Sequence, residues 1–138
     1  MSDYQEVYDY FKHYKTIHEA ITRLEERLET IKSKYELQAQ KYSAEPSGKG
    51  GKPASYDTML MQTERLYKQL EKLYYEADTI KATFDKQSIL VDDQLAMRVI
   101  EMYFFDGMSH QEVAINLHLA PSRVSQLKRK GLECINLN

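Results

Sequence analysis

Hydrophobic residues recur in alternating steps of three and four along the first part of the chain. The repeated positions are Val7, Tyr10, Tyr14, Ile17, Ile21, Leu24, Leu28, Ile31, Tyr35, Gln38 and Tyr42. This spacing places the side chains on one stripe of a helix, with glutamate and lysine filling the flanks. A single helix cannot bury such a stripe by itself. The pattern therefore predicts a long helix over about residues 3–42 that packs against a partner helix.

Residues 43–55 interrupt the repeat, because they hold two of the three prolines and three of the five glycines. This density of proline and glycine predicts a loop. The spacing of three and four then returns over about residues 56–88. The repeated positions there are Met59, Thr63, Leu66, Leu70, Leu73, Ala77, Ile80 and Phe84. Two helices of similar length joined by a polar loop predict an antiparallel coiled-coil hairpin, which forms a first domain over residues 1–90.

An antiparallel hairpin brings the start of the first helix beside the end of the second. Additional apolar residues occur at both of these ends, so the apolar surface there is wider than one stripe needs. They are Tyr4, Val7, Tyr8, Phe11 and Tyr14 at the start, and Ile80, Phe84 and residues 89–91 at the end. We expect this end of the hairpin to pack on a C-terminal domain and the loop end to point into solvent.

A shorter apolar pattern begins near residue 91 and predicts a second domain over residues 91–138. Either Asp92 or Asp93 can cap its first helix, because a carboxylate accepts from the free N–H groups of a helix start. The apolar positions of this helix are Leu95, Val99, Met102 and Tyr103. Gly107 supplies the backbone freedom that a helix end requires.

Two further helices follow, separated by a short turn. Ser109 and Glu112 have the spacing of a capping box, which predicts a helix over about residues 110–117. Pro121 suits the first turn of a helix and predicts a last helix that extends to about Ile135. Two short helices separated by a three-residue turn predict a helix-turn-helix.

The last two helices divide into an inward and an outward side. The residues expected to face inward are Val113, Ala114, Leu117, Val124 and Leu127, with Ala114 small enough for close helix packing. The outward stripe of the last helix holds Ser122, Ser125, Gln126 and Arg129, and the basic residues beside it are Arg123, Lys128 and Lys130. Short polar groups and an arginine on one stripe can contact base edges in a major groove, and flanking cations can contact phosphates.

These features carry a resemblance to known families. Residues 95–135 resemble region 4 of sigma-70-type RNA polymerase sigma factors, and the stretch SRVSQ at residues 122–126 is similar to recognition helices of that group. The whole chain resembles, in its architecture, the small phage and prophage regulators of the RinA and ArpU type, which activate late genes. The resemblance implies a transcription regulator that binds double-stranded DNA, with recognition positions at Ser122, Arg123, Ser125, Gln126 and Arg129. The pattern departs from the usual one at His118, where glycine is common, and at Ala120, where serine or threonine is common.

One such DNA-binding module makes few contacts. We therefore expect a homodimer formed through the hairpin, or assistance from RNA polymerase. A complete sigma factor is not expected, because no basic, aromatic-rich helix for unpaired strands is present. The alternative is a small phage packaging (terminase) subunit or another oligomeric DNA-binding assembly protein, and a third reading is an adaptor whose basic helix binds an acidic protein. A monomer or dimer favours transcription, and a ring of eight or more subunits favours packaging.

The charge of the chain bears on DNA binding mainly through its distribution near the C-terminus. The net charge is −2, which argues against indiscriminate coating of nucleic acid. The segment from Ala120 to Asn138, however, holds four basic residues and one acid. A basic patch on the last helix therefore remains compatible with DNA binding.

The remaining chemistry is sparse. The four histidines have no pair at a helical ligand spacing and Cys134 is the single cysteine, so we expect no metal site and no disulfide. The segment GKGGKP lacks the spacing of a phosphate-binding loop, and no catalytic set is visible, so we expect neither a cofactor nor an enzyme. No run of eighteen apolar residues and no secretion signal occur, which predicts a cytoplasmic protein.

Overall fold

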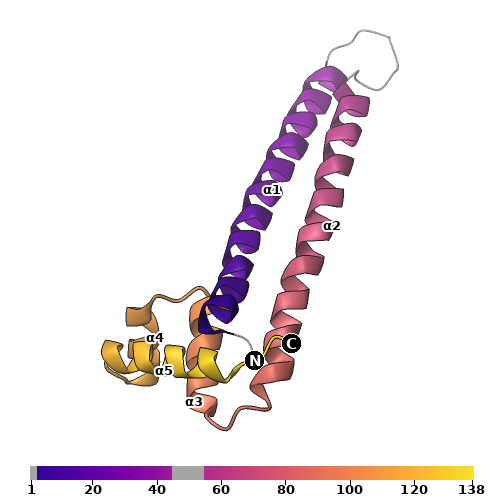
Figure 1. Cartoon of the computed structure of the whole chain (residues 1–138). Coiled ribbons are helices and arrows are strands. Elements are labelled where there is room, and N and C mark those ends of the chain that lie inside the picture. Colours follow the sequence, from indigo (N-terminus) through magenta and orange to yellow (C-terminus); the bar gives the residue numbers. More distant parts are fainter. Residues whose placement is uncertain (1–2, 45–54) are drawn as a thin grey trace. The chain divides into compact units, whose positions relative to one another are not determined.

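The computed structural model describes residues 3–44 and 55–138, and these residues form helices without a strand (Figure 1). Two long helices come first and form a hairpin: α1 over Tyr4–Ala44 and α2 over Ser55–Ser88. Shorter elements follow: α3 (Gln94–Ile100), the π-helical turn η1 (Glu101–Phe105), α4 (His110–Leu117) and α5 (Pro121–Cys134). The predicted all-helical class, a helical hairpin followed by three shorter helices, is confirmed.

The two long helices begin and end within two residues of their predicted bounds of 3–42 and 56–88. The predicted loop at residues 43–55 lies outside the described residues, except for its first two residues and its last, which belong to α1 and α2. Coiled-coil packing within the hairpin stays a prediction.

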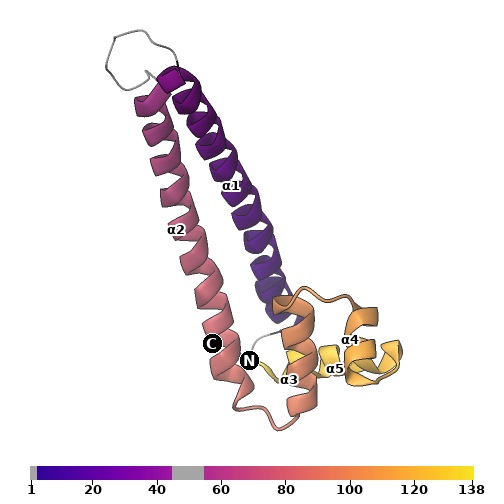
Figure 2. The ribbon, with the colours of Figure 1, turned by 180° about the vertical axis from the view of Figure 1, so that it is seen from behind.

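The chain divides into two compact units, one formed by Met1–His18 with Tyr75–Asn138 and the other by Glu19–Tyr74. The first unit holds the start of α1, the end of α2 and all the shorter helices (Figure 2). The functional division at residue 90 stays a prediction.

The unit Glu19–Tyr74 buries positions that the repeat selects on both helices. These are Ile21, Leu28, Thr63, Leu66 and Leu70. The hydroxyl of Thr63 donates to the carbonyl oxygen of Leu60 at 3.1 Å, so its burial leaves no unsatisfied group. Gln38 was expected on the same stripe but is exposed, since burial of an amide without a hydrogen-bond partner is costly.

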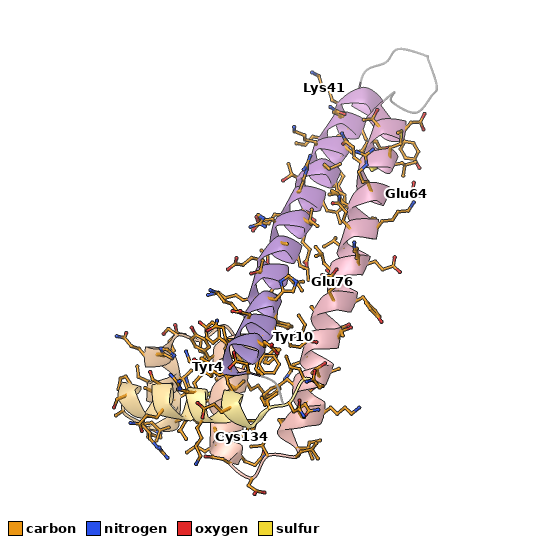
Figure 3. The ribbon with its side chains drawn as sticks, viewed as in Figure 1. Tyr4, Tyr10, Lys41, Glu64, Glu76 and Cys134 are labelled. Atoms are coloured by element: carbon orange, nitrogen blue, oxygen red, sulfur yellow. The ribbon has the colours of Figure 1, made fainter. Side chains whose placement is uncertain are left out.

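An aromatic cluster forms the core where α1 begins. The ring of Phe11 is fully buried and lies 5.7 Å from Phe84, 5.9 Å from Phe104 and 5.6 Å from Phe105, measured between ring centroids. Tyr14 adds a contact to Phe105 at 4.7 Å. The expectation that the apolar start of α1 packs on the end of α2 and on the C-terminal elements is confirmed. The first turns of α1, with Tyr4 and Tyr10 labelled, are drawn in Figure 3.

Ile89 and Leu90 do not join this cluster as expected, whereas Val91 is half-buried. Ile89 and Leu90 are 78% and 74% exposed. The reason is that α2 ends at Ser88 and the chain turns there, with the N–H of Leu90 donating to Gln87 at 3.0 Å. Side chains in this turn point away from the helix face that continues into the core.

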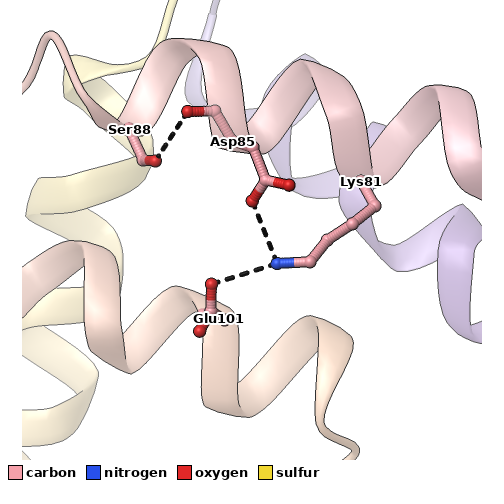
Figure 4. Close-up of polar contacts among 4 residues, drawn as sticks. All are labelled: Lys81, Asp85, Ser88 and Glu101. Atoms are coloured by element: carbon pink, nitrogen blue, oxygen red, sulfur yellow. Dashed lines mark hydrogen bonds and ion pairs between the residues drawn. The ribbon is translucent and has the colours of Figure 1, made fainter.

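A salt-bridge network joins α2 to η1 (Figure 4). The ammonium of Lys81 lies 3.1 Å from Asp85 and 3.0 Å from Glu101, and it is 5.0 Å above the ring of Phe84. Burial lowers the pKa of Lys81, but hydrogen bonds to the two carboxylates outweigh this and raise the pKa above its ordinary value. The network links η1 to the end of α2.

Candidate nucleic-acid interface

Helix α3 is capped by Asp93, whose carboxylate accepts from the N–H of Ala96 at 3.0 Å. This hydrogen bond, together with the nearby ammonium of Lys130, lowers the pKa of Asp93. The prediction that Leu95 belongs to the apolar face is wrong, since Leu95 is 41% exposed. The buried face is formed by Ala96, Met97, Val99 and Ile100, and Leu95 lies at its edge.

The turn η1 continues α3 with a wider hydrogen-bonding step, in which the N–H of Asp106 donates to Glu101 at 3.0 Å. A π-helical turn places one more residue in the turn than an α-helix does, so it rotates the following side chains. Phe104 is therefore buried, whereas Tyr103 is only half-buried. Gly107 ends the element at φ +72°, as its predicted capping role requires.

Helix α4 has the predicted serine cap, but the Glu112 carboxylate bonds the Ser109 hydroxyl and not the Ser109 backbone N–H of a complete capping box. The N–H of Glu112 donates to the hydroxyl oxygen of Ser109 at 3.2 Å, and that hydroxyl donates to the Glu112 carboxylate at 3.2 Å. The helix ends at His118, which adopts φ 57° and ψ 44°. His118, which stands where glycine is common, thus adopts the left-handed conformation itself, and this lets the N–H of Leu119 reach the carbonyl of Ala114 at 2.9 Å.

Helix α5 begins with Pro121 at its first position, as predicted. The preceding residue, Ala120, has the extended conformation of an N-cap but no side-chain acceptor. Its carbonyl alone accepts from the N–H groups of Arg123 and Val124, at 3.0 and 3.1 Å. The start of α5 is therefore stabilised by backbone hydrogen bonds to Ala120, without a side-chain cap.

The facing sides of α4 and α5 are the apolar ones that the sequence selects. Val113, Val124 and Leu127 are fully buried, and Ala114 is 5% exposed. Leu117 is half-buried at the edge of this contact. The predicted inward set is confirmed, so the opposite edge of α5 faces outward.

Close packing of α5 on α3 depends on Gly131, a residue outside the predicted set. A Cβ atom at this position would lie 2.6 Å from Cδ1 of Ile100, 3.0 Å from Cε of Met97 and 3.2 Å from Cβ of Ala96. These distances leave no room for a side chain. A glycine inside an otherwise good helical pattern is the sequence signal for such an approach.

Six of the seven predicted site residues are exposed on α5. They are Ser122, Arg123, Ser125, Gln126, Arg129 and Lys130. The guanidinium of Arg129 is paired with Glu133, at 3.2 Å, and lies 4.9 Å from the ring centroid of Tyr4. The ammonium of Lys130 lies 3.2 Å from Asp93. Both ion pairs lie at the surface, where they contribute little and can be exchanged for other anions.

The seventh predicted residue, Lys128, is placed differently. Its side chain is buried, with the residue only 8% exposed, although a phosphate-contacting cation was expected. Its ammonium lies 2.9 Å from Nε2 of His110, 4.3 Å from the ring centroid of Tyr103 and 5.4 Å from that of Tyr8. Burial lowers the pKa of Lys128. Lys128 therefore joins α5 to α4, η1 and α1 instead of sharing the outward edge.

The described residues, 3–44 and 55–138, contain no group of three or more potential metal ligands. Within the same residues, no helix is long and apolar enough to cross a membrane. Cys134, near the end of α5, is exposed and forms no disulfide (Figure 3).

Comparison with known proteins identifies the C-terminal elements. No curated protein and no solved structure matches the chain significantly. The family model described as Sigma-70, region 4, matches residues 93–136, which include all of α3 with its N-cap, η1, α4 and α5. Sigma-70 region 4 is a DNA-binding helix-turn-helix, and the caps, turn and inward residues of this segment have that arrangement. Residues 93–136 are therefore a DNA-binding helix-turn-helix domain of the sigma-70 region 4 type.

Proposed function

We propose that the chain is a sequence-specific regulator of transcription that binds double-stranded DNA and acts on phage or prophage genes. The observation that carries this proposal is the two-sided character of α5. Val124 and Leu127 are fully buried on one side, while the polar residues Ser122, Ser125 and Gln126 are exposed on the other. An exposed polar edge on a rigidly seated helix is what insertion into a major groove requires.

The exposed residues of α5 divide into two roles. Ser122, Ser125, Gln126 and Arg129 contact base edges and select the sequence. Arg123 and Lys130 contact phosphates and supply affinity that falls with salt. The ion pair between Lys130 and Asp93 opens when a phosphate replaces the carboxylate, because the Lys130 side chain is 61% exposed. Lys128 supports α5 from behind, since its ammonium is turned toward His110.

Pairing of two chains through their hairpins brings a second helix-turn-helix domain to the DNA. A single module makes too few contacts for tight binding, and a homodimer doubles them. Exposed apolar residues of α2 support this step: Leu60, Tyr67 and Tyr74 are spaced seven residues apart and are 44%, 48% and 44% exposed. Tyr67 and Tyr74 already contact Lys32 and Glu25 of α1, but their exposed ring surface lies on a second stripe of the helix, which a second hairpin can cover. Assistance from RNA polymerase is the other source of additional contacts.

The proposal is tested by selection from random DNA duplexes with the purified full chain, beside a measurement of molecular mass in solution. We expect a defined recognition sequence and a dimer. Arg129→Ala should weaken specific binding by about 1 to 3 kcal/mol and relax the preference at one base pair. A matched control is Lys68→Ala, which removes a cation that is paired with Glu64 on the other unit.

Three results count against transcription regulation as proposed. A selection without any enriched sequence contradicts sequence-specific binding. An unchanged preference in Arg129→Ala contradicts the role of that side chain. A ring of eight or more subunits favours the packaging function instead.

A further inference from the structure

A hollow of about 410 Å³ lies where α1 passes the start of α4, within the unit that contains the DNA-binding domain. Three elements of the chain line it. The lining residues are Tyr8, Lys12 and Lys15 of α1, Tyr103 and Phe104 of η1, and Gly107, Met108, Ser109, His110 and Glu112 at the start of α4. The matched domain thus shares this surface with a helix that lies outside it.

The hollow is basic at its α1 wall. Lys12 and Lys15 are exposed and, being three residues apart, lie on neighbouring positions of one helix face. Neither forms an ion pair with a carboxylate among the residues that the structure describes. The ammonium of Lys12 lies 5.9 Å from the ring centroid of Tyr8. Both cations therefore remain available to an anion from solution.

The opposite wall of the hollow has few carboxylates that could pair with Lys12 and Lys15. Glu112 is the single carboxylate in the lining, and its Oε1 already accepts from the hydroxyl of Ser109 at 3.2 Å. His110 faces the buried ammonium of Lys128 on the other side, at 2.9 Å, so the wall behind it is cationic as well. The surface is electrostatically suited to a polyanion.

The position of α4 indicates that the anion at this surface is the phosphate backbone of DNA. When the second helix of a helix-turn-helix lies in the major groove, the first helix crosses the DNA backbone. Because α5 is the second helix, the start of α4 faces phosphates, and Lys12 and Lys15 stand beside that start. We propose that Lys12 and Lys15 of α1 bind the DNA backbone next to α4, so that the first helix of the hairpin is part of the DNA interface. This inference rests on the function proposed above.

Contacts of this kind add affinity without choosing a sequence. Each phosphate that a cation neutralises releases counterions, which makes binding fall more steeply with salt. Two lysines that each contact one phosphate raise the slope of log affinity against log salt concentration by about 1.8. They also fix the orientation of the hairpin on the duplex.

The test uses the full chain and its selected duplex, with affinity measured over a series of salt concentrations. In Lys12→Gln/Lys15→Gln we expect the slope to become shallower by about 1.8 and the selected sequence to stay the same. Lys12→Arg/Lys15→Arg should keep the wild-type slope. The matched control is Lys34→Gln/Lys68→Gln, which removes two exposed lysines of the other unit and should also keep it.

The outcomes separate the two proposals. If the wild-type chain binds its duplex and the Lys12/Lys15 glutamine variant has an unchanged slope, this inference is overturned while the proposed function stands. An equal decrease in the Lys34/Lys68 control assigns the effect to net charge and also overturns it. If the wild-type chain binds no duplex even at low salt, both proposals fail. Thermal unfolding of each variant shows that an altered slope does not come from lost folding.

Discussion

The ammonium nitrogen of Lys128 lies 2.9 Å from Nε2 of His110, so the recognition helix α5 is hydrogen-bonded to the first residue of α4. An ammonium can only donate, which requires Nε2 to be an unprotonated acceptor. The imidazole also stacks on Tyr103, with ring centroids 4.7 Å apart and an interplanar angle of 14°. The hydrogen bond between α4 and α5 therefore depends on the neutral form of His110.

This link predicts sensitivity to acid. Burial lowers the pKa of His110, and the charge of Lys128 lowers it further. Because the unfolded chain has an ordinary histidine pKa of about 6.5, it binds the proton more readily than the folded chain does. The contribution of His110 to stability is complete above about pH 6.5 and is lost as pH falls toward the folded-state pKa.

Urea unfolding between about pH 5 and pH 8 measures this effect. We expect the free energy of unfolding of the wild-type chain to decrease toward the acidic end, and His110→Gln to flatten this decrease. His13→Gln is the matched control, because His13 is exposed on α1, and it should keep the wild-type profile. A His110→Gln profile parallel to that of the wild type would contradict the prediction.

The two lysines near the end of the recognition helix should differ in their effect on DNA binding. Lys130 is exposed, and Lys130→Gln should make the slope of log affinity against log salt shallower by about 0.9. Lys128 is buried, and Lys128→Met preserves its apolar stem, so this variant should keep the slope. Duplex titration over a salt series checks both. A decrease of similar size in Lys128→Met would return that residue to the phosphate-contacting set.

Local signals in the sequence predicted most of the DNA-binding domain. Capping by Asp93 and by Ser109 depends on side chains within three residues of the helix start, and Pro121 fixes its own backbone. Such contacts need no knowledge of the rest of the fold. The inward pair Val124 and Leu127 followed from helical spacing alone.

The sequence prediction placed Lys128 among the phosphate contacts because of its charge, although its helical position indicates burial. It lies four residues after Val124 and four before Leu132, both fully buried, so helical spacing places it on the inner side. What the sequence does not contain is the partner set, since Tyr8 and Tyr103 come from distant elements. The π-helical turn η1 was likewise outside local reasoning, because the core contacts of Phe104 involve α1.

Adding a single methyl group at Gly131 should destabilise the domain. In Gly131→Ala the new Cβ would lie 2.6 Å from Cδ1 of Ile100, whose side chain is fully buried and cannot move aside freely. We expect a loss of about 1 to 2 kcal/mol, since overpacking of a core costs more than alanine gains in helix propensity. The second change Ile100→Val removes Cδ1. The double variant should therefore lose less than the sum of the two single changes, and strict additivity of the unfolding free energies would contradict the close contact.

The start of the recognition helix offers a stabilising change. Ala120 has φ −70° and ψ 145°, the backbone of an N-cap, but its side chain accepts no hydrogen bond. In Ala120→Ser the hydroxyl oxygen should accept from the N–H of Arg123, as that of Ser109 does from Glu112 at 3.2 Å. We expect a gain of about 0.5 to 1 kcal/mol in the free energy of unfolding, measured by urea denaturation. Ala120→Thr and Ala120→Val form a matched pair that differs by a hydroxyl and a methyl group. The threonine variant should have the higher free energy of unfolding. Equal values for the two variants would show that a side-chain cap does not stabilise the start of α5.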